Sequence, residues 1–395
     1  MSLKDLKDKY AIVGVGYAPQ GRVPNRTAVS LYVEACVNAV KDAGLRREDI
    51  DGLILYRAFP TAPGEVQASA YQVGYHLGLS LHALSQEADC CRAQLFTAIG
   101  WLEAGLCNYV VIAYADNPLS SGTDFLGRMS DMWSDMNQLA FGHFGATSSM
   151  AMMAQRDIHT GHSSGPEAWK EIAVGIRRWA NLNPIAMMHD RILTFNDYYN
   201  ARWVVEPFRL YDNCLINDGG RAFVLTSTER ARDLKHRPAI IMGMGYANPC
   251  CDQQQLKCTD RPSGIKTSGE MAFKMAGITI NDVDACEPYD CFTWGVESDL
   301  MDYGFFGPGE GADWFKGGTI APGGRMPMAT SGGLLSEAYY MGVTPLTEAA
   351  MQLMGRCGDR QLGPKTNTKE PEIILCWDKG GFPQGSLSTT ILRRW

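Results

Sequence analysis

The sequence predicts a layered α/β fold made of two similar halves, on three grounds. Two glycine-containing blocks recur in the same order, patterns for buried strands alternate with patterns for helices, and the composition is globular. Hydrophobic residues make up 45% and charged residues 20% of the 395 positions. Such a composition excludes disordered, fibrous and coiled-coil proteins.

The repeat begins with an apolar strand that carries two glycines. Residues 12–17 read Ile-Val-Gly-Val-Gly-Tyr, and residues 241–246 read Ile-Met-Gly-Met-Gly-Tyr. The next block, Ala-Val-Lys-Asp-Ala-Gly-Leu at 39–45, returns at 272–278 as Ala-Phe-Lys-Met-Ala-Gly-Ile. The offsets are 229 and 233 residues, so the two copies differ by a four-residue insertion. Agreement of both blocks in the same order indicates a duplication.

Each half is predicted to fold as strand, helix, strand, helix, strand. In the first half, residues 28–44 have apolar side chains at helical spacing and end in a glycine. A further helix at 94–105 leads into the apolar strand 109–115, just as the helix at 345–355 leads into strand 372–377. Buried strands of this kind are covered by helices on both faces of their sheet.

The two halves are predicted to be duplicated βαβαβ units, the first at residues 1–235 and the second at 236–395. A long stretch of the first half, from about 116 to 211, is rich in Met, Trp, Asn and Gly and has no regular pattern. Within it, the Met-rich residues 150–153 are interpreted as helix core rather than as an acyl tunnel. Long irregular loops in compact enzymes are usually functional, so we expect a lid or cap.

Charge and hydropathy narrow the possible partners. A formal net charge of −7 argues against nucleic-acid binding, which requires a basic face. No apolar run reaches the roughly 20 residues that span a bilayer, and the acidic residues near the start do not fit a secretion signal. We therefore expect a cytoplasmic protein that binds neither nucleic acid nor membrane.

Two motifs that can mark cofactor sites have simpler interpretations. The glycines of Gly14-Val-Gly16 lack the third glycine of a dinucleotide motif, because Pro19 stands there, and the pair recurs in the second half. Plain packing at the end of the strand is therefore preferred. The twelve cysteines are expected to be reduced, and one tight group lacks a second pair or a histidine nearby: Cys250, Cys251 and Cys258. We expect no metal site and no tightly bound cofactor.

Six motifs are spread over most of the chain: Glu171–Val174, Asn181–Pro184, Glu206–Asp212, Asp218–Gly220, Glu287–Phe292 and Ser331–Gly342. As a set they resemble the thiolase superfamily, in particular sterol-carrier-protein-type thiolases and the lipid-transfer-protein-type aldolases that shorten steroid side chains. The resemblance implies a thiolase-like five-layered αβαβα fold, an acyl-CoA substrate that brings the coenzyme A with it, and a homodimer. It also implies a small partner protein with a zinc ribbon and an OB-fold barrel.

The chain departs from that resemblance at two positions. Thiolases of this type carry His-Asp-Cys-Phe where this chain has Tyr289-Asp-Cys-Phe, and Gly-His-Pro where it has Ala-Tyr339-Tyr. The chain has no histidine after His236. Tyrosines at both positions resemble the side-chain aldolases, which implies retro-aldol cleavage of a β-hydroxyacyl-CoA to a ketone or aldehyde and a shorter acyl-CoA.

Tyr289 and Tyr339 are therefore predicted to handle the protons of this reaction. A phenol has an ordinary pKa near 10, so a role as base near pH 7 would require that pKa to be lowered. A cation or hydrogen bonds to phenolate would lower it, whereas apolar burial would raise it. Asp290 and Glu337 are expected to orient the two rings.

Backbone groups complete the predicted site. The enolate oxygen of the leaving acyl-CoA would be held by N–H groups around Gly332 and Gly333 and near Gly380 and Gly381. Basic residues that could meet the phosphates of coenzyme A are Arg177, Arg178, Arg202 and Arg209, although a solvated surface position is the commoner outcome for each.

Two other functions stay open. Cys90 precedes a predicted helix, near where thiolases place their nucleophile, and could bear an acyl group in a thiolase or C-acyltransferase. Loss of both histidines also fits a non-catalytic subunit of a complex. His143 in the cap stretch and Tyr56, which matches Tyr289 in the repeat, are further candidates for the site.

Overall fold

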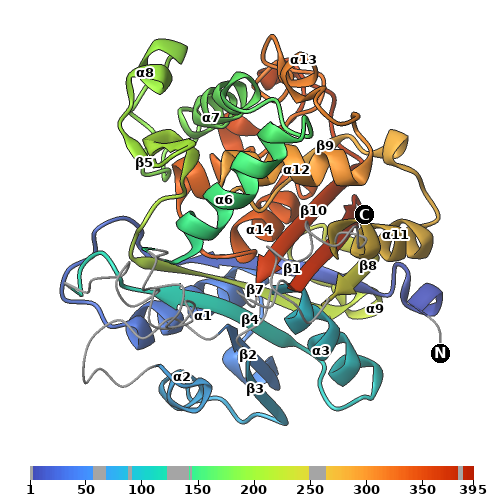
Figure 1. The fold of residues 1–395 in the computed structure, drawn as a ribbon. Helices are drawn as coiled ribbons and strands as arrows, with labels where there is room; N and C mark the ends of the chain where they lie inside the picture. The colour runs from blue at the N-terminus through green and yellow to red at the C-terminus, as the bar shows by residue number, and fades with distance from the viewer. Residues whose placement is uncertain are drawn as a thin grey trace.

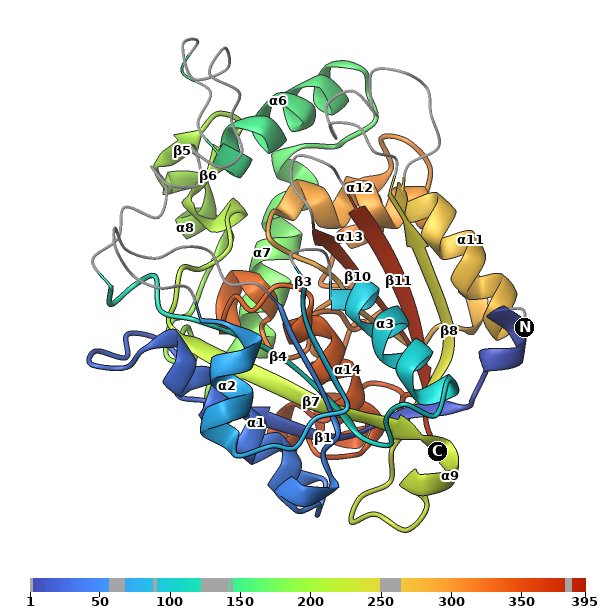
Figure 2. The same ribbon diagram turned by 90° about the horizontal axis from the view of Figure 1, so that it is seen from below.

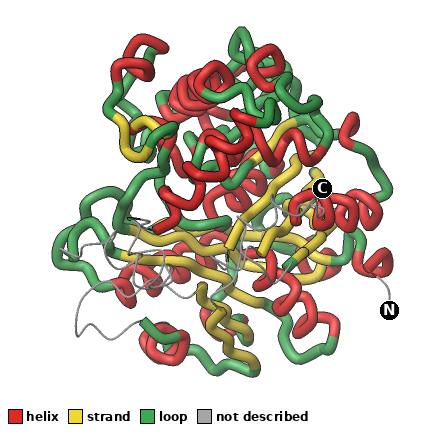
Figure 3. Tube along the Cα trace, in the orientation of Figure 1, coloured by secondary structure: helices red, strands yellow, loops and turns green. Residues whose placement is uncertain are grey.

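The computed structural model describes residues 3–56, 68–87, 91–121, 142, 145–248, 264–380 and 386–395 (Figure 1). Within these ranges the central element is a mixed nine-stranded sheet with helices on both sides (Figures 1 and 3). Its strands are β1 Tyr10–Tyr17, β2 Gly52–Tyr56, β3 Ala83–Glu87, β4 Val110–Asp116, β7 Gly219–Ser227, β8 Ala239–Ala247, β9 Ala285–Glu287, β10 Ile373–Gly380 and β11 Ser386–Arg393. A separate two-stranded ribbon consists of β5 Trp203–Val205 and β6 Phe208–Arg209.

The helices fall between these strands along the chain. In the first half they are α1 Ala28–Asp42, α2 Ala70–Leu77, α3 Cys91–Glu103, α6 Gly145–His159, α7 Pro166–Ala180, α8 Phe195–Asn200 and α9 Thr228–Ala231. In the second half they are α11 Gly264–Ala276, α12 Thr293–Tyr303, α13 Gly311–Phe315 and α14 Val343–Leu353. A single π-helical turn, which we call the π-turn, spans Gly333–Glu337. Short 3₁₀ turns lie at Leu3–Leu6, Arg47–Asp49, Leu210–Asp212, Ile280–Asp282, Gly358–Arg360 and Pro364–Thr366.

The strand order demonstrates the duplication. The sheet runs β3-β2-β4-β7-β1-β8-β11-β10-β9, and its halves meet where β1 pairs briefly with β8. Outward from this junction, β1-β7-β4-β2 and β8-β11-β10-β9 have the same pattern of two antiparallel pairs followed by one parallel pair. The duplicated halves are therefore confirmed, although the exact boundary near residue 235 stays a prediction.

The helices divide the two halves into layers. Helix α1 packs on β1, β4 and β7, and α11 packs on β8 and β11. Helices α3 and α14 each contact strands of both halves, and Figure 2 shows them between the two groups of strands. The layers therefore follow one another as α1, the strands of the first half, the central helices α3 and α14, the strands of the second half, and α11. This arrangement confirms the predicted five-layered αβαβα class.

The repeated glycine pairs have a packing role, and the surfaces that they meet are the adjacent helices. A Cβ atom built on Gly14 would lie 2.6 Å from the carbonyl oxygen of Ala39, on the adjacent α1. One built on Gly245 would lie 2.7 Å from the carbonyl carbon of Ser268, on α11. Because a side chain would displace the helix backbone, glycine lets α1 and α11 lie directly against their strands.

The predicted irregularity of the cap stretch is wrong for residues 145–200, which form α6, α7 and α8 above the sheet in Figure 1. Helix α7 starts with Pro166 after Gly165, a favourable N-terminal sequence, and buries Trp169 and Trp179. Its apolar residues repeat at helical spacing, a signal that the interpretation as a loop overlooked. In α6, Met150 and Met153 are buried while Met152 is exposed, so the interpretation as helix core is confirmed.

No helix among the described residues is both long and apolar enough to cross a bilayer. The cysteines 250, 251 and 258 lie outside the described residues. Within the described part, no three His, Cys, Asp or Glu side chains gather in a way that could hold a metal ion.

Candidate active site

The structure brings the two predicted tyrosines together. Tyr289 follows β9, Tyr339 follows the π-turn, and their hydroxyl oxygens lie 2.7 Å apart. The ring centroids are 6.3 Å apart with the planes at 65°, an edge-on contact. In this phenol pair, Tyr289 is buried and Tyr339 is half-buried.

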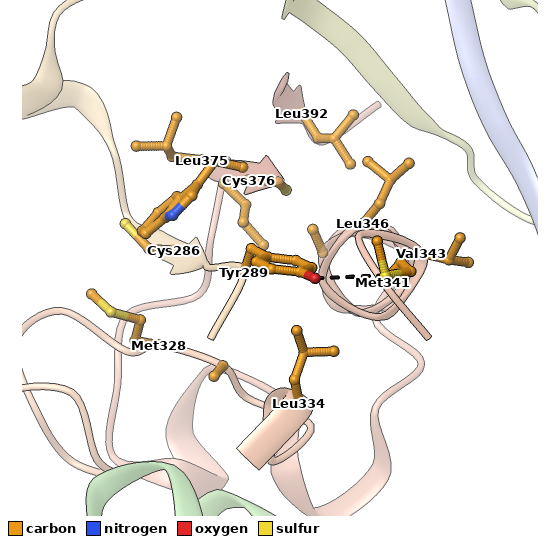
Figure 4. Packing of buried hydrophobic residues seen from close by; sticks show 14 of the residues in the cluster. Cys286, Tyr289, Met328, Leu334, Met341, Val343, Leu346, Leu375, Cys376 and Leu392 are labelled. Carbon is orange, nitrogen blue, oxygen red and sulfur yellow. Dashed lines mark hydrogen bonds between the residues drawn. The ribbon is translucent and has the colours of Figure 1, made fainter. Parts of the chain in front are cut away.

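The phenol pair lies in apolar surroundings. Figure 4 shows the Tyr289 ring among Leu334, Leu346 and Met341, with its hydroxyl directed at the Met341 sulfur. Burial raises the pKa of both phenols well above 10. Nearby acidic groups, including the Cys291 thiol, raise both pKa values further. The shift is opposite to the lowering that a phenolate base would need. Both tyrosines are therefore neutral at pH 7, able to donate one proton while accepting another.

Asp290 holds the backbone that leads to Tyr339 rather than the ring of Tyr289. Its carboxylate accepts hydrogen bonds from the N–H groups of Leu334 (2.8 Å) and Leu335 (3.2 Å), at the start of the π-turn. Burial raises the pKa of Asp290 to about 7, although these hydrogen bonds act to lower it. A Cβ on Gly333, whose φ is +56°, would overlap this carboxylate, so the turn requires glycine.

The predicted oxyanion donors are engaged within the protein. The N–H of Gly332 donates to the Ala329 carbonyl at 2.9 Å, and that of Gly333 to the Ser331 hydroxyl at 3.2 Å. A role in holding an enolate stays a prediction, and it would require these bonds to be exchanged. Gly380 ends β10 opposite Ser386, and Gly381 lies outside the described residues.

Glu337, expected to orient a tyrosine ring, instead pairs with a buried arginine. Its carboxylate forms an ion pair with Arg221 of β7, and both side chains are almost fully buried. The Arg221 guanidinium lies over the rings of Tyr17 (4.6 Å) and Tyr340 (5.2 Å). This pair joins the end of the π-turn to the first half of the sheet.

Two residues of the site were missed by sequence reasoning. The side-chain oxygen of Asn217 accepts the backbone N–H of Tyr339 at 2.6 Å. The sulfur of Met341 lies 2.7 Å from the Tyr339 hydroxyl and 3.5 Å from that of Tyr289. Asn217 directly precedes the quoted Asp218–Gly220 motif, a position that could have drawn attention to it. Met341 lies inside the quoted Ser331–Gly342 motif, but its residue type gave no reason to single it out, because a methionine in a buried loop is usually packing.

The remaining candidates are three residues that the structure does not describe and Tyr56. Cys90, His143 and Gly381 lie outside the described residues, although α3 begins directly after Cys90. Tyr56 is buried at the end of β2 and contacts Tyr114 at 5.3 Å, yet its position near Tyr339 contributes to that residue's raised pKa. It thus belongs both to the core and to the surroundings of the site.

Arg177 does not face a ligand. It is buried on α7 and donates to the Ser336 hydroxyl at 2.8 Å and to the Arg191 carbonyl at 3.2 Å. Its guanidinium supports the π-turn, and a contact with coenzyme A stays a prediction that this burial does not favour. Arg209 lies over the Trp203 ring at 3.8 Å, whereas Arg178 and Arg202 are exposed.

Comparison with known proteins places this geometry in a family. Residues 252–390 match a family model described as "Thiolase C-terminal domain-like". A steroid side-chain-cleaving aldolase of Thermomonospora curvata is 33% identical over 366 residues, covering 87% of this chain and 90% of that protein. A 17-hydroxy-3-oxo-4-pregnene-20-carboxyl-CoA lyase of Mycobacterium tuberculosis is 33% identical over 364 residues, covering 89% and 92%.

Solved structures agree with these relatives. One described as "Ltp2-ChsH2(DUF35) aldolase" superposes with a TM-score of 0.85 at 30% identity, and the match covers 98% of each chain. Human mitochondrial 3-ketoacyl-CoA thiolase has the same fold, with a TM-score of 0.70 at 14% identity over 98% of this chain and 99% of that one. The chain therefore belongs to the thiolase superfamily, within its group of carbon–carbon-cleaving aldolases.

Proposed function

We propose that this aldolase cleaves a β-hydroxyacyl-CoA by a retro-aldol reaction in which the phenol pair of Tyr289 and Tyr339 transfers the protons. The observation that carries the proposal is the 2.7 Å hydrogen bond between the two hydroxyl groups, at the positions where the resemblance would place imidazoles. The reaction needs no acyl-enzyme, which suits tyrosines at the positions of those imidazoles.

The proposed steps balance with both tyrosines neutral throughout. The Tyr339 oxygen accepts the proton of the substrate β-hydroxyl, and the Cα–Cβ bond breaks as the C–O bond becomes a carbonyl. The bond's electron pair passes toward the acyl-CoA enolate, and a phenol proton of the pair moves to Cα in the same concerted step. The Tyr289–Tyr339 hydrogen bond redistributes the protons, so both phenols are restored and no oxonium ion forms at Tyr339.

Electrostatics support this relay over a phenolate base. Burial raises the pKa of both phenols well above the ordinary value, so a phenolate would be scarce near pH 7. A relay needs no ionised tyrosine, because one proton enters the pair as another leaves. An apolar site then helps, since it penalises every charged intermediate state of the pair.

The relatives suggest the kind of substrate. One is named for steroid side-chain cleavage, and the other for the CoA ester of a 17-hydroxy-3-oxo-4-pregnene carboxylic acid. We infer that this chain acts on the CoA ester of a bulky tertiary alcohol of the same chemical class. Its products would be a ketone and a shorter acyl-CoA.

Incubation of the purified protein with β-hydroxyacyl-CoA, with and without free coenzyme A, tests the reaction. An aldolase releases the carbonyl product in both cases, whereas a thiolase consumes the added thiol. Requirement for free coenzyme A, together with an acyl group on Cys90 in mass spectra, would favour the acyltransferase instead.

Substitution tests the phenol pair. We expect Tyr289→Phe and Tyr339→Phe each to lower kcat by about a hundredfold or more, the usual contribution of general acid–base catalysis. Tyr303→Phe is the matched control, because the Tyr303 hydroxyl makes a hydrogen bond of equal length, 2.7 Å, to Thr389. Activity retained in both site variants would refute the relay.

Two assemblies are proposed alongside the activity. The solved structure named for Ltp2 with ChsH2(DUF35) supports a small partner protein, of the zinc-ribbon and OB-fold kind, which co-purification would detect. A homodimer is supported by β3, which forms one edge of the described sheet and carries the exposed Leu84. Light scattering should give a dimer mass for the wild type and a monomer mass for Leu84→Lys.

A further inference from the structure

Met341 has a backbone conformation that methionine rarely adopts. Its φ is +51°, in the left-handed region, although a glycine stands directly after it at position 342. Left-handed backbone costs a residue with a side chain about 1 kcal/mol or more, and such positions cluster at functional sites. The side chain that this conformation presents is almost fully buried, with 3% exposure.

The conformation places the Met341 sulfur against both phenols. The sulfur lies 2.7 Å from the Tyr339 oxygen and 3.5 Å from the Tyr289 oxygen, and the two oxygens are themselves 2.7 Å apart. Tyr339 and Met341 are separated by a single residue, so the unusual backbone turn brings the thioether back onto the ring of its near neighbour.

The Met341 sulfur bears on which of the two phenols donates a proton to the other. Two neutral phenols have two hydroxyl protons, one of which forms the hydrogen bond between them. The other proton needs an acceptor, and the Met341 sulfur lies within reach of both hydroxyls, nearer to that of Tyr339. If Tyr339 directs its proton at the sulfur, Tyr289 donates to Tyr339, and the remaining lone pair of the Tyr339 oxygen is left to accept a hydroxyl proton from substrate.

We propose that Met341 is a positioning residue that holds the Tyr339 proton on its thioether sulfur and so presents the Tyr339 oxygen to the substrate as an acceptor. This inference rests on the proposed function of the phenol pair and adds a direction to its proton transfer. A thioether suits the task because it is a weak acceptor. It orients the proton in the resting site and releases it readily when Cα requires one.

Two substitutions at Met341 replace the weak acceptor in opposite ways, one with no acceptor and one with a stronger acceptor. Met341→Leu keeps an apolar side chain of similar volume without an acceptor, so the Tyr339 proton is free to point at the substrate hydroxyl. Met341→Gln provides a stronger acceptor, which retains the proton. Met351→Leu, at a largely buried methionine of α14, is the matched control.

We expect kcat to fall about tenfold in both Met341 variants, equivalent to one modest hydrogen bond, with KM changed less than about twofold. The solvent deuterium isotope effect on kcat should rise, because proton transfer becomes more difficult. A change in packing alone would leave that isotope effect unaltered. Thermal unfolding midpoints within a few degrees of the wild type would show that the fold is retained.

Different results would refute the role of Met341 and the function of the phenol pair. If Tyr339→Phe is inactive while Met341→Leu keeps the wild-type kcat and isotope effect, the role of Met341 is refuted and the phenol pair stands. A rise in KM alone would likewise overturn it. If Tyr289→Phe and Tyr339→Phe are both fully active, the function of the pair itself is wrong.

Discussion

Replacement of Asp290 by asparagine should make the stability of the protein less dependent on pH. The wild-type carboxylate is buried and accepts the N–H groups of Leu334 and Leu335. Burial raises its pKa from 3.8 to about 7, which means that desolvation of the charge outweighs those two hydrogen bonds. The folded protein therefore binds this proton more tightly than the unfolded chain does.

The difference between the folded and unfolded pKa of Asp290 sets the sign and size of the change in stability with pH. A carboxyl with a raised folded-state pKa contributes stability that is complete below the unfolded pKa near 4 and is lost as pH rises through about 7. Between pH 5 and pH 8, the loss amounts to about 2.5 kcal/mol in the free energy of unfolding. The amide that Asp290→Asn introduces does not titrate, so the variant lacks this contribution.

Denaturant unfolding of both proteins at pH 5, 6, 7 and 8 measures the effect. The free energy of unfolding of the wild type, minus that of Asp290→Asn, should fall by about 2.5 kcal/mol from pH 5 to pH 8. Other buried acids titrate equally in both proteins and cancel. The hydrogen bond that the amide cannot accept adds a constant offset. A difference that stays constant within about 0.5 kcal/mol would refute the argument that burial dominates at Asp290.

Further predictions concern the supports of the site and the repeat. Glu337→Gln leaves Arg221 as an uncompensated buried charge and should lower the free energy of unfolding by about 3 kcal/mol or more; a loss below about 1 kcal/mol would contradict this. Asn217→Ala frees the N–H that fixes the Tyr339 backbone and should lower kcat about tenfold, with steady-state kinetics as the measurement. Gly245→Ala forces a side chain into α11 and should destabilise by about 2 kcal/mol, whereas Gly100→Ala, in open space on α3, should stabilise by about 0.5 kcal/mol in the same denaturant assay.

The fold could be predicted from the sequence because its main signals are local. The glycines at 14 and 16, with their copies at 243 and 245, mark where a helix lies directly on a strand. Together with the helix-ending glycines 44 and 277, both at positive φ, they define one strand–helix unit in each half. The sheet order adds only the pairing of these units about β1 and β8.

The site was only partly predictable, because its properties depend on contacts between distant segments. The meeting of Tyr289 and Tyr339 could be anticipated from the resemblance, because both stand where thiolases of this type carry histidines. The direction of their pKa shift could not, since desolvation sums over side chains from both halves of the chain. Asp290 likewise contacts a turn more than forty residues away along the chain. The left-handed backbone of Met341 has no signal in its residue type at all.

The apolar setting of the phenol pair is consistent with the proposed use of tyrosine in place of histidine. A thiolase must store a thiol proton while an acyl group rests on the enzyme, and imidazole does so by becoming a cation. Retro-aldol cleavage removes a proton from one atom of the substrate and returns a proton to another atom of the same molecule. A neutral pair can complete that exchange without holding a charge between steps. Because desolvation penalises charge but not the neutral relay, the burial that makes each phenol a poor base is compatible with the proposed chemistry.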